Sequence, residues 1–322
     1  SLPTRRSRVR PPLPAPKIVI KSKILTSIFQ KYLNNKDIRI FKKNFFYFVI
    51  FRIIRNFLAK DLIIKIYNFK VFGSFKRNKT SYYLLKKCEF GDYHELSVIK
   101  KISKKSKTLL IDCGCNYGFY SFYTASLARE NLVISIEASK KTSKEFLKNL
   151  KLNNFSNINF YNRAISNIDD KKISFNESEN DWESSQTHNN FKIESIINVK
   201  TLKIDTLMKN YDFNKYQTII KLDVEGNEIK VIQGGLEFIK NTSPLIIIEF
   251  SRYIFENLNN IDYLMKFLNN YDYSIYDTSK NKKNLGDILT KLNLLKKKFK
   301  TIGNYYLIKN SSKSLQNFIS DE

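Results

Sequence analysis

Hydrophobic runs and polar stretches alternate regularly along the chain from about residue 81 onward. Short apolar runs predict strands, and the longer amphipathic segments between them predict helices. Strands that alternate with helices are typical of βαβ units, so the pattern predicts an α/β fold with a doubly wound, mostly parallel, seven-stranded Rossmann-like sheet. The seven expected strands are 109–112, 132–137, 158–161, 218–222, 245–250, 273–276 and 304–308, preceded by an extended segment, 81–88. The expected helices include 93–104, 140–152 and segments that begin near 119 and 227.

The first 80 residues follow a different pattern. Residues 1–16 hold five of the six prolines, and we expect a disordered tail or a non-native segment there. Residues 17–70 combine Lys and Arg with large apolar side chains, which predicts two helices in a basic N-terminal extension, residues 17–80. The α/β domain is then expected over residues 81–312 and a C-terminal tail over 313–322.

Charge is concentrated in the same N-terminal part. The chain has a net charge of +26, and residues 1–70 contain 17 Lys and Arg but only Asp37 and Asp61, a net charge of +15. A basic surface favours nucleic acid or an anionic membrane as a partner. A bias towards residues with AT-rich codons explains the same charge equally well, because Lys, Asn and Ile are abundant.

A membrane-spanning segment is not expected, because no uncharged run reaches the roughly 18 to 20 residues that a span needs. The densest apolar run, 45–51, is followed directly by Arg52 and Arg55. Two interpretations stay open for this region: an amphipathic helix at a membrane surface, or a cap over the α/β domain. We therefore expect a cytoplasmic protein that contacts membranes at most peripherally.

Cysteine and histidine are too few for a disulfide framework or a histidine-rich metal centre. The chain has Cys88, Cys113 and Cys115, and its histidines are His94 and His188. Free thiols in a reducing compartment are the expectation. The spacing of Cys113 and Cys115 resembles a metal-binding pair, but no further Cys or His follows nearby, so no metal site is expected.

The segment 109–121, LLIDCGCNYGFYS, predicts a ligand-binding turn between a strand and a helix. Gly114 and Gly118 allow a sharp turn and a close approach to a ligand, and Asn116 lies between them. The first such turn of an open α/β sheet lies at the crevice where ligands bind. Its spacing does not satisfy the dinucleotide fingerprint G-x-G-x-x-G.

Two acids suggest the ligand. Asp112 begins the turn and suits a cation better than a pyrophosphate, so it favours S-adenosylmethionine, whose ammonium it could attract. Glu137 ends the next strand, where an acid accepts hydrogen bonds from paired ribose hydroxyls. A structural alternative is a glycine turn beside two surface acids that bind nothing.

A second pair of acids follows the strand 218–222. Asp223 and Glu225 are expected at the same sheet edge as the first pair, with Gly226 permitting the turn into the next helix. We expect Asp223 to face the methionine end of the cofactor or the acceptor, and Glu225 to orient the acceptor hydroxyl. The alternative is that both acids only cap the helix. Glu249 ends the next strand and could contact substrate or form a structural salt bridge.

Three further residues complete the expected site. Asn162 and Ala164 follow the strand 158–161, where contact with the adenine is expected. His188 lies in the polar stretch 166–190 and could act as a base, with Trp182 stacking on a sugar; an exposed polar loop is the ordinary interpretation.

Four segments of the chain resemble, in sequence and in order, motifs of one family, the FkbM-type methyltransferases. The resemblance extends over about residues 91–250. Cys115 departs from the Ala of that family's D-x-G-A-N-x-G-x-x-S motif, and Ala138-Ser139 replaces its more usual Pro-Asn. The segments are 110–121 (LIDCGCNYGFYS), 132–153 (LVISIEASKKTSKEFLKNLKLN), 220–235 (IKLDVEGNEIKVIQGG) and 244–251 (PLIIIEFS).

The resemblance implies a class I methyltransferase fold, S-adenosylmethionine as cofactor, and O-methylation of a sugar, glycan or small metabolite. Two alternatives remain: an RNA methyltransferase that uses the basic charge, and a catalytically silent binding protein on the same fold. Nucleic acid is the less favoured partner, because the chain has no N/D-P-P-Y/F motif or recognisable RNA-binding module. The oligomeric state is not predicted.

Overall fold

The computed structural model describes residues 17–19, 62–73, 92–178, 193–294 and 301–320. The chain divides into two compact units, residues 1–91 and 92–322. Most of the expected N-terminal helices, the expected extended segment 81–88, and both Trp182 and His188 lie outside the described residues.

The described part of the first unit is a sheet, where the pattern had predicted helices. The antiparallel strands are β1 (Lys17–Val19), β2 (Leu62–Ile66) and β3 (Phe69–Gly73), in the order β1-β2-β3. A two-residue turn with Tyr67 at φ 50° joins β2 to β3. The β-branched residues of LIIKI favour the extended backbone and explain the difference.

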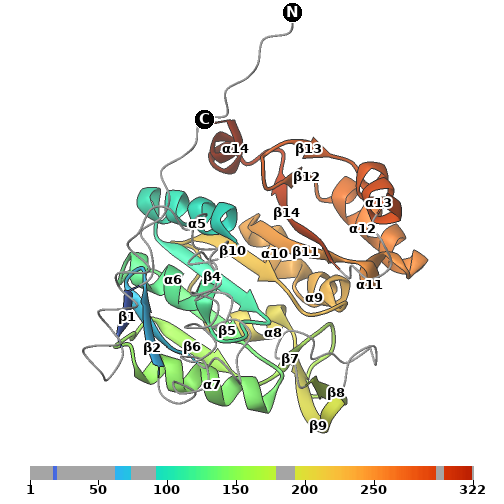
Figure 1. Cartoon of the computed structure of the whole chain (residues 1–322). Coiled ribbons are helices and arrows are strands. Elements are labelled where there is room, and N and C mark those ends of the chain that lie inside the picture. Colours follow the sequence, from blue (N-terminus) through green and yellow to red (C-terminus); the bar gives the residue numbers. More distant parts are fainter. Residues whose placement is uncertain (1–16, 20–61, 74–91, 179–192, 295–300, 321–322) are drawn as a thin grey trace, which may run out of the picture. The chain divides into compact units, whose positions relative to one another are not determined.

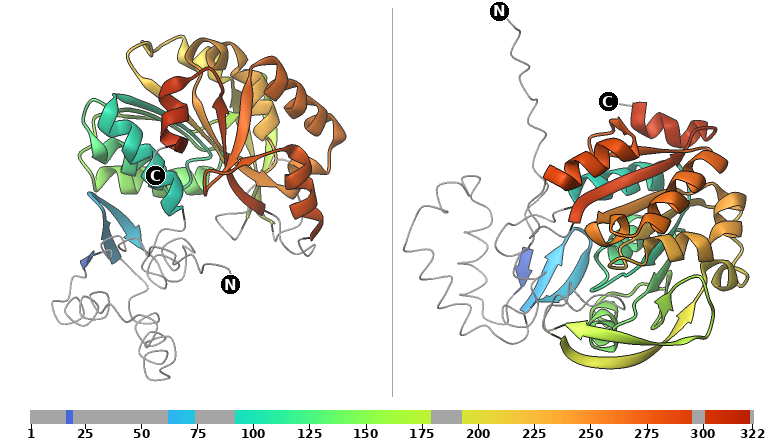
Figure 2. Two further views of the ribbon diagram at one scale, coloured as in Figure 1. Left: turned by 90° about the horizontal axis from the view of Figure 1, so that it is seen from above. Right: turned by 90° about the vertical axis from the view of Figure 1, so that its right-hand side faces the viewer.

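The second unit is built on an eight-stranded sheet with helices on both faces (Figures 1 and 2). The strand order is β13-β12-β14-β11-β10-β4-β5-β6, and the central pairs from β11 to β6 are parallel. The strands are β4 (Thr108–Cys113), β5 (Leu132–Ile136), β6 (Ile158–Tyr161), β10 (Gln217–Leu222), β11 (Leu245–Ser251), β12 (Tyr273–Asp277), β13 (Lys282–Lys283) and β14 (Thr301–Lys309).

This confirms the doubly wound, mostly parallel α/β fold, with one correction to the strand number. The two-residue strand β13 extends the edge beyond β12, so the described sheet has eight strands and not seven. Its sequence, Lys-Lys, has no apolar residue and therefore no signal in a hydrophobic pattern.

Apolar residues drive the assembly of both layers. All six residues of β4 are buried, as in parallel strands covered on both faces. Aromatic stacking of Phe122, Phe146 and Phe160 joins α6, α7 and β6. The helices are α5 (Tyr93–Lys105), α6 (Phe119–Leu127), α7 (Lys140–Lys151), α8 (Ile204–Met208), α9 (Glu228–Gly234), α10 (Leu236–Thr242), α11 (Arg252–Phe255), α12 (Leu258–Asn270), α13 (Leu285–Leu294) and α14 (Lys313–Ser320).

Two segments differ from their sequence predictions. Part of the stretch 166–190, expected to be irregular, forms β8 (Lys172–Ser178), which pairs with β9 (Ile193–Leu202); β7 (Ala164–Ile165) completes this small sheet in the order β7-β9-β8. The expected tail after residue 312 forms α14, whose Leu315 and Phe318 are buried. In both segments the apolar residues are interspersed with polar ones, so the hydrophobic pattern did not indicate a strand or a helix there.

The order of the strands reverses direction beside β4, in the middle of the main sheet. From β4 the chain proceeds outward to β5 and β6, whereas β10 and β11 lie on the other side of β4. Ligands of such sheets bind beyond the carboxyl ends of the strands at this reversal. The predicted turn after β4 and the predicted acids after β10 both lie there.

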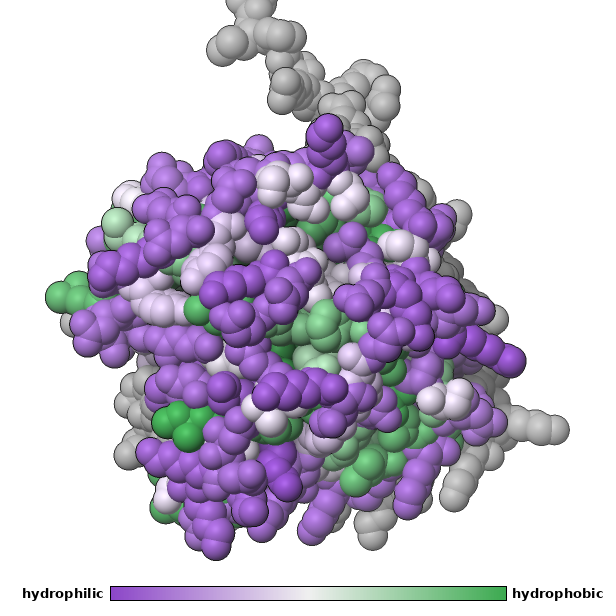
Figure 3. All heavy atoms as spheres, turned by 180° about the vertical axis from the view of Figure 1, so that it is seen from behind, coloured by the Kyte–Doolittle hydropathy of each residue, from purple (hydrophilic) through white to green (hydrophobic). Residues whose placement is uncertain are grey.

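The surface of the described residues is mostly polar. On the face shown in Figure 3, hydrophilic side chains predominate and apolar ones occupy smaller areas between them, as on ordinary globular domains. No helix in the described ranges has the length and apolar character of a membrane span.

Candidate functional site

The turn after β4 is hydrogen-bonded to β5 and lies against the loop after β10. The amides of Gly114 and Cys115 donate to the Ile136 carbonyl at 2.9 and 3.0 Å. Gly114 has φ 79°, and a Cβ on it would lie 1.9 Å from the carbonyl oxygen of Asp223. Only glycine therefore lets this turn lie so close to the loop after β10.

Asn116 and Gly118 continue the turn in the left-handed conformation, with φ 48° and 89°. A Cβ on Gly118 would lie 2.5 Å from the Phe122 ring and 2.7 Å from the Phe146 ring. The glycine is thus required for packing at the start of α6. The role in cofactor binding expected for Asn116 and Gly118 stays a prediction.

Glu137 lies directly after β5 and is held by backbone amides. Its Oε2 accepts a hydrogen bond from the Asn116 N–H at 3.0 Å, and its Oε1 accepts one from the Ser139 N–H at 2.8 Å. Each carboxylate oxygen keeps a further acceptor site. Burial raises the pKa of Glu137 to about 7 against these two bonds, and the charges of Asp112 and Asp223 add to the rise.

Asp112, near the end of β4, is the most enclosed of the predicted acids, with 2% of its surface exposed. Its Oδ2 accepts a hydrogen bond from Ser121 Oγ at 2.5 Å, and that hydroxyl also bonds Ser135 at 2.7 Å. Burial raises the pKa of Asp112 to about 6, although the Ser121 bond opposes the shift. Asp112 can therefore change its charge in response to a cation.

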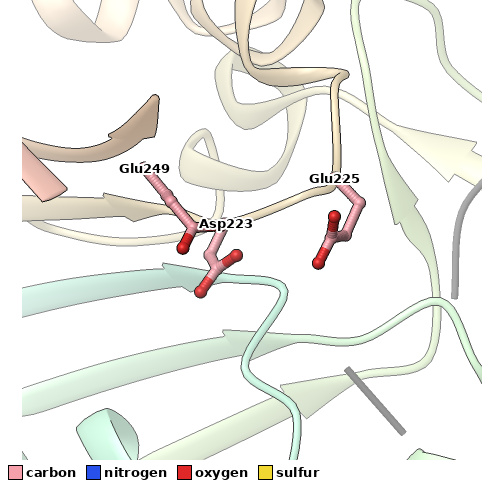
Figure 4. A group of neighbouring side chains, drawn as sticks. All are labelled: Asp223, Glu225 and Glu249. Atoms are coloured by element: carbon pink, nitrogen blue, oxygen red, sulfur yellow. The ribbon is translucent and has the colours of Figure 1, made fainter. Parts of the chain in front are cut away.

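Three carboxylates converge beyond β10 and β11, as Figure 4 shows. Asp223 and Glu249 lie side by side, and Glu225 turns back towards them from farther along the loop. One oxygen of each lies within 4.8 Å of the others. Carboxylates this close share a proton or hold a cation. The absence of a metal site, expected from the few Cys and His residues, stays a prediction.

Glu249 is the acid of this group whose protonated form the surroundings favour. Burial and the charges of Asp223 and Glu225 raise its pKa well above the usual value, and it is hydrogen-bonded to Asp223. Asp223 is partly accessible, with 38% of its side chain exposed. The open carboxylate of Asp223 can therefore accept a proton or face a cation.

A buried ammonium lies behind these acids. Lys221, on β10, has 2% of its side chain exposed, and its Nζ lies 3.2 Å from Asp223 Oδ2 and 3.3 Å from Asn304 Oδ1. Burial lowers the pKa of Lys221, but the charges of Asp223, Glu249 and Asp92 outweigh it and raise that pKa. Lys221 therefore stays charged and offsets part of the negative charge.

Glu228 organises the turn between β10 and α9. Its Oε1 accepts hydrogen bonds from the Val224 and Gly226 amides, both at 3.2 Å. Burial raises its pKa to about 7. Two amides of the turn before α9 are thus bonded by Glu228, an acid that was not among the predicted residues.

The other predicted residues are spread over two places. Asn162 Nδ2 donates to the carbonyls of Glu137 and Ala138, at 2.8 and 3.1 Å, so it supports the loop after β5. Ala164 is buried in β7 and pairs with Thr201. Contact of either with adenine stays a prediction, as does the role of His188, which lies outside the described residues.

Several polar residues beside the predicted ones were missed at the sequence level. A lysine within the apolar run QTIIKL could have pointed to Lys221, because a buried lysine requires a charged partner. Asp92 accepts a hydrogen bond from the Tyr120 hydroxyl at 2.9 Å, and Glu177 lies buried on β8. Neither acid has a motif that would mark it.

The sequence matches one known protein family over about half of its length. Residues 112–275 match the family described as the Methyltransferase FkbM domain. No curated protein matches the sequence significantly. Solved structures similar to the chain include methyltransferase FkbM from Methylobacillus flagellatus KT, with 16% identity and a TM-score of 0.39 over 71% of this chain and 52% of that one.

Two further solved structures are similar to the chain. A putative caffeoyl-CoA O-methyltransferase from Staphylococcus aureus has 14% identity and a TM-score of 0.40, covering 71% of this chain and 89% of that one. M. jannaschii TYW2 in complex with AdoMet has 12% identity and a TM-score of 0.37, covering 76% and 82%.

The chain spans about half the length of the Methylobacillus protein. The family match itself extends from Asp112 at the end of β4 to Ile275 in β12, and it contains the turn, both acid pairs and Glu249. Because this match covers half of the sequence, the chain belongs to the FkbM family of S-adenosylmethionine-dependent methyltransferases.

Proposed function

We propose that this protein transfers a methyl group from S-adenosylmethionine to a hydroxyl of a sugar, glycan or small metabolite. The observation that carries the proposal is the convergence of Asp223, Glu225 and Glu249 beyond β10 and β11. A hydroxyl acceptor must lose a proton, and a carboxylate positioned beside it can accept that proton.

The residues after β4 and β5 fit the cofactor. Glu137 has one free acceptor site on each carboxylate oxygen for ribose hydroxyls, beside the amides that hold it. Asp112 supplies negative charge for the ammonium of the methionine part. The turn at Gly114 brings these groups to the same sheet edge.

The acids after β10 act on the acceptor. In methyl transfer the acceptor oxygen forms a bond to the methyl carbon, the carbon–sulfur bond breaks, and its electron pair stays on sulfur. Asp223 accepts the hydroxyl proton, and Glu225 orients the hydroxyl. Positioning contributes the larger part of the acceleration, because the leaving group is already good. His188 remains a further candidate for the base.

Titration of the protein with S-adenosylmethionine in a calorimeter tests cofactor binding. We expect saturable binding that weakens roughly tenfold or more in Glu137→Gln, because a buried charged acceptor of hydrogen bonds is lost. Asp212→Asn is the matched control, since Asp212 is an exposed acid paired with Lys215. No saturable binding by the wild-type protein would overturn the proposal.

The acceptor atom is tested with 13C-methyl-labelled cofactor and fractionated small molecules, glycans and RNA. We expect an O-methyl carbon signal in a glycan or small-molecule fraction, and loss of that signal in Asp223→Asn with cofactor binding largely retained. An N-methyl product, or label in RNA alone, would contradict the O-methyltransferase assignment. Absence of transfer to every fraction would favour a silent binding protein.

We further propose that the basic N-terminal residues attract anionic membrane surfaces that carry the acceptor. The net charge of +15 in residues 1–70 supports this. The full chain should sediment with vesicles containing anionic lipid at low salt and not with neutral vesicles. Equal sedimentation with both vesicle types would refute it.

A further inference from the structure

Glu177 lies outside the main sheet, on the hairpin of β8 and β9, yet it is buried. Only 6% of its surface is exposed. Along β8 the inward positions are Ile173, Phe175 and Glu177, so a carboxylate occupies a place where the pattern provides apolar residues. A buried carboxylate is costly unless several donors surround it.

The donors come mainly from the first turn of α7. Ser139 Oγ donates to Glu177 Oε1 at 2.6 Å, and the Lys141 N–H donates to the same oxygen at 3.0 Å. Ser195 on β9 donates to Oε2 at 2.9 Å. Burial raises the pKa of Glu177, but these bonds outweigh it and lower that pKa, so the group is an ionised carboxylate at the helix start.

The same turn holds Glu137 from its other side. The Ser139 N–H donates to Glu137 Oε1 at 2.8 Å, and Ser139 Oγ accepts a hydrogen bond from the Thr142 N–H at 3.1 Å. Ser139 thus uses its amide for one acid and its hydroxyl proton for the other. The position of Ser139 sets the direction of one of the two amides that orient Glu137.

We infer that Glu177 is a positioning residue of the nucleoside site, which fixes Ser139 and through it orients Glu137 towards the ribose hydroxyls. The inference rests on the proposed function, because it assigns Glu137 to the ribose. It makes the hairpin of β8 and β9 part of the cofactor site. It also gives a role to Ser139, which belongs to the pair Ala138-Ser139 that stands where the FkbM family more usually has Pro-Asn.

The test compares two probes, S-adenosylhomocysteine and its 2′-deoxyribose analogue, by calorimetry on the full chain. Wild-type protein should prefer the complete ribose. We expect Glu177→Gln to weaken binding of S-adenosylhomocysteine roughly tenfold. Binding of the deoxy analogue should weaken less, so that the preference between the probes falls.

Glu194→Gln is the matched control. Glu194 lies on β9 and forms a salt bridge with Lys141 in the same helix turn, but both side chains are more than 40% exposed. Exposed pairs of this kind contribute little. The control should keep the affinity and the preference of the wild-type protein.

A uniform loss for both probes in Glu177→Gln, with the preference intact, would overturn the inference and leave Glu177 a structural residue. Should that variant fail to fold, Ser139→Ala removes the connecting hydroxyl and must lower the preference in the same way. Wild-type protein that binds neither probe would instead reject the proposed function.

Discussion

The two halves of the sheet edge hold their acids by different means. At the carboxyl ends of β4 and β5, Asp112 and Glu137 are bonded by a hydroxyl and by backbone amides, which are neutral donors in fixed positions. At the carboxyl ends of β10 and β11, Asp223 and Glu249 lie beside each other and beside the ammonium of Lys221. Neutral donors fix direction, whereas the charged cluster concentrates charge and can move a proton.

This difference matches the two tasks of a methyl transfer. Recognition of a nucleoside needs acceptors in fixed directions, which the amides of the β4–β5 half provide. Activation of an acceptor needs a base whose protonation responds to its neighbours, which the β10–β11 half provides. Substitutions that alter one half alone can therefore separate binding from chemistry.

The largest effect is expected for Lys221→Met. It removes the buried ammonium that faces Asp223 and leaves the surrounding acids without this counter-charge, so stability should fall by about 3 kcal/mol. Urea unfolding measures this loss. Lys309→Met is the matched control, because Lys309 lies on β14 in the same sheet but its Nζ bonds the Ser243 hydroxyl. Equal losses in both variants would contradict an electrostatic role for Lys221.

A second variant should disturb the junction of the two halves. Gly114→Ala places a Cβ against the Asp223 carbonyl, so we expect stability to fall by about 2 kcal/mol and S-adenosylmethionine binding to weaken. Gly303→Ala is the control: Gly303 also has a positive φ, 125°, but a Cβ there meets nothing within 4 Å. An equal loss of stability in the two variants, measured by thermal unfolding, would show that a Cβ at residue 114 does not clash with the Asp223 carbonyl.

The smallest effect is a change in the pH dependence of binding. Acids with raised pKa keep their protons to higher pH in the free protein, so binding of a cationic cofactor should release protons and tighten as pH rises through about 6 to 7. Asp112→Asn should flatten the part of this profile near pH 6 and weaken binding roughly tenfold at pH 8.

Calorimetry with S-adenosylmethionine from pH 5 to pH 8, in buffers of different ionisation enthalpy, measures both the affinity and the protons released. An Asp112→Asn profile that coincides with that of the wild-type protein would show that the carboxyl does not take part. Asp212→Asn again serves as the control, because its carboxylate is exposed.

Much of the fold could be predicted from local patterns. The strand 158–161 and the helix start at residue 119 agree with the structure, and most other boundaries differ by one or two residues. The errors occur where periodicity is weak: β8 alternates apolar and polar residues across a stretch rich in Ser, Asn and Asp, and β13 is a lysine pair. The rule that ligands of open α/β sheets bind beyond the carboxyl ends of the strands predicted Asp112, Glu137 and Asp223 at one sheet edge, and the parallel order of β5, β4 and β10 agrees with it.

What the sequence by itself determined is the order of elements and the acids that end the strands, because hydrophobic periodicity and strand-end motifs are local properties. The interaction of Lys221 with Glu249 and Asp92, and the hydrogen bond of Ser139 to Glu177, depend on residues tens of positions apart. Only the tertiary structure could decide these contacts, because burial changes the cost of each charge and the partners that offset it come from different strands and helices.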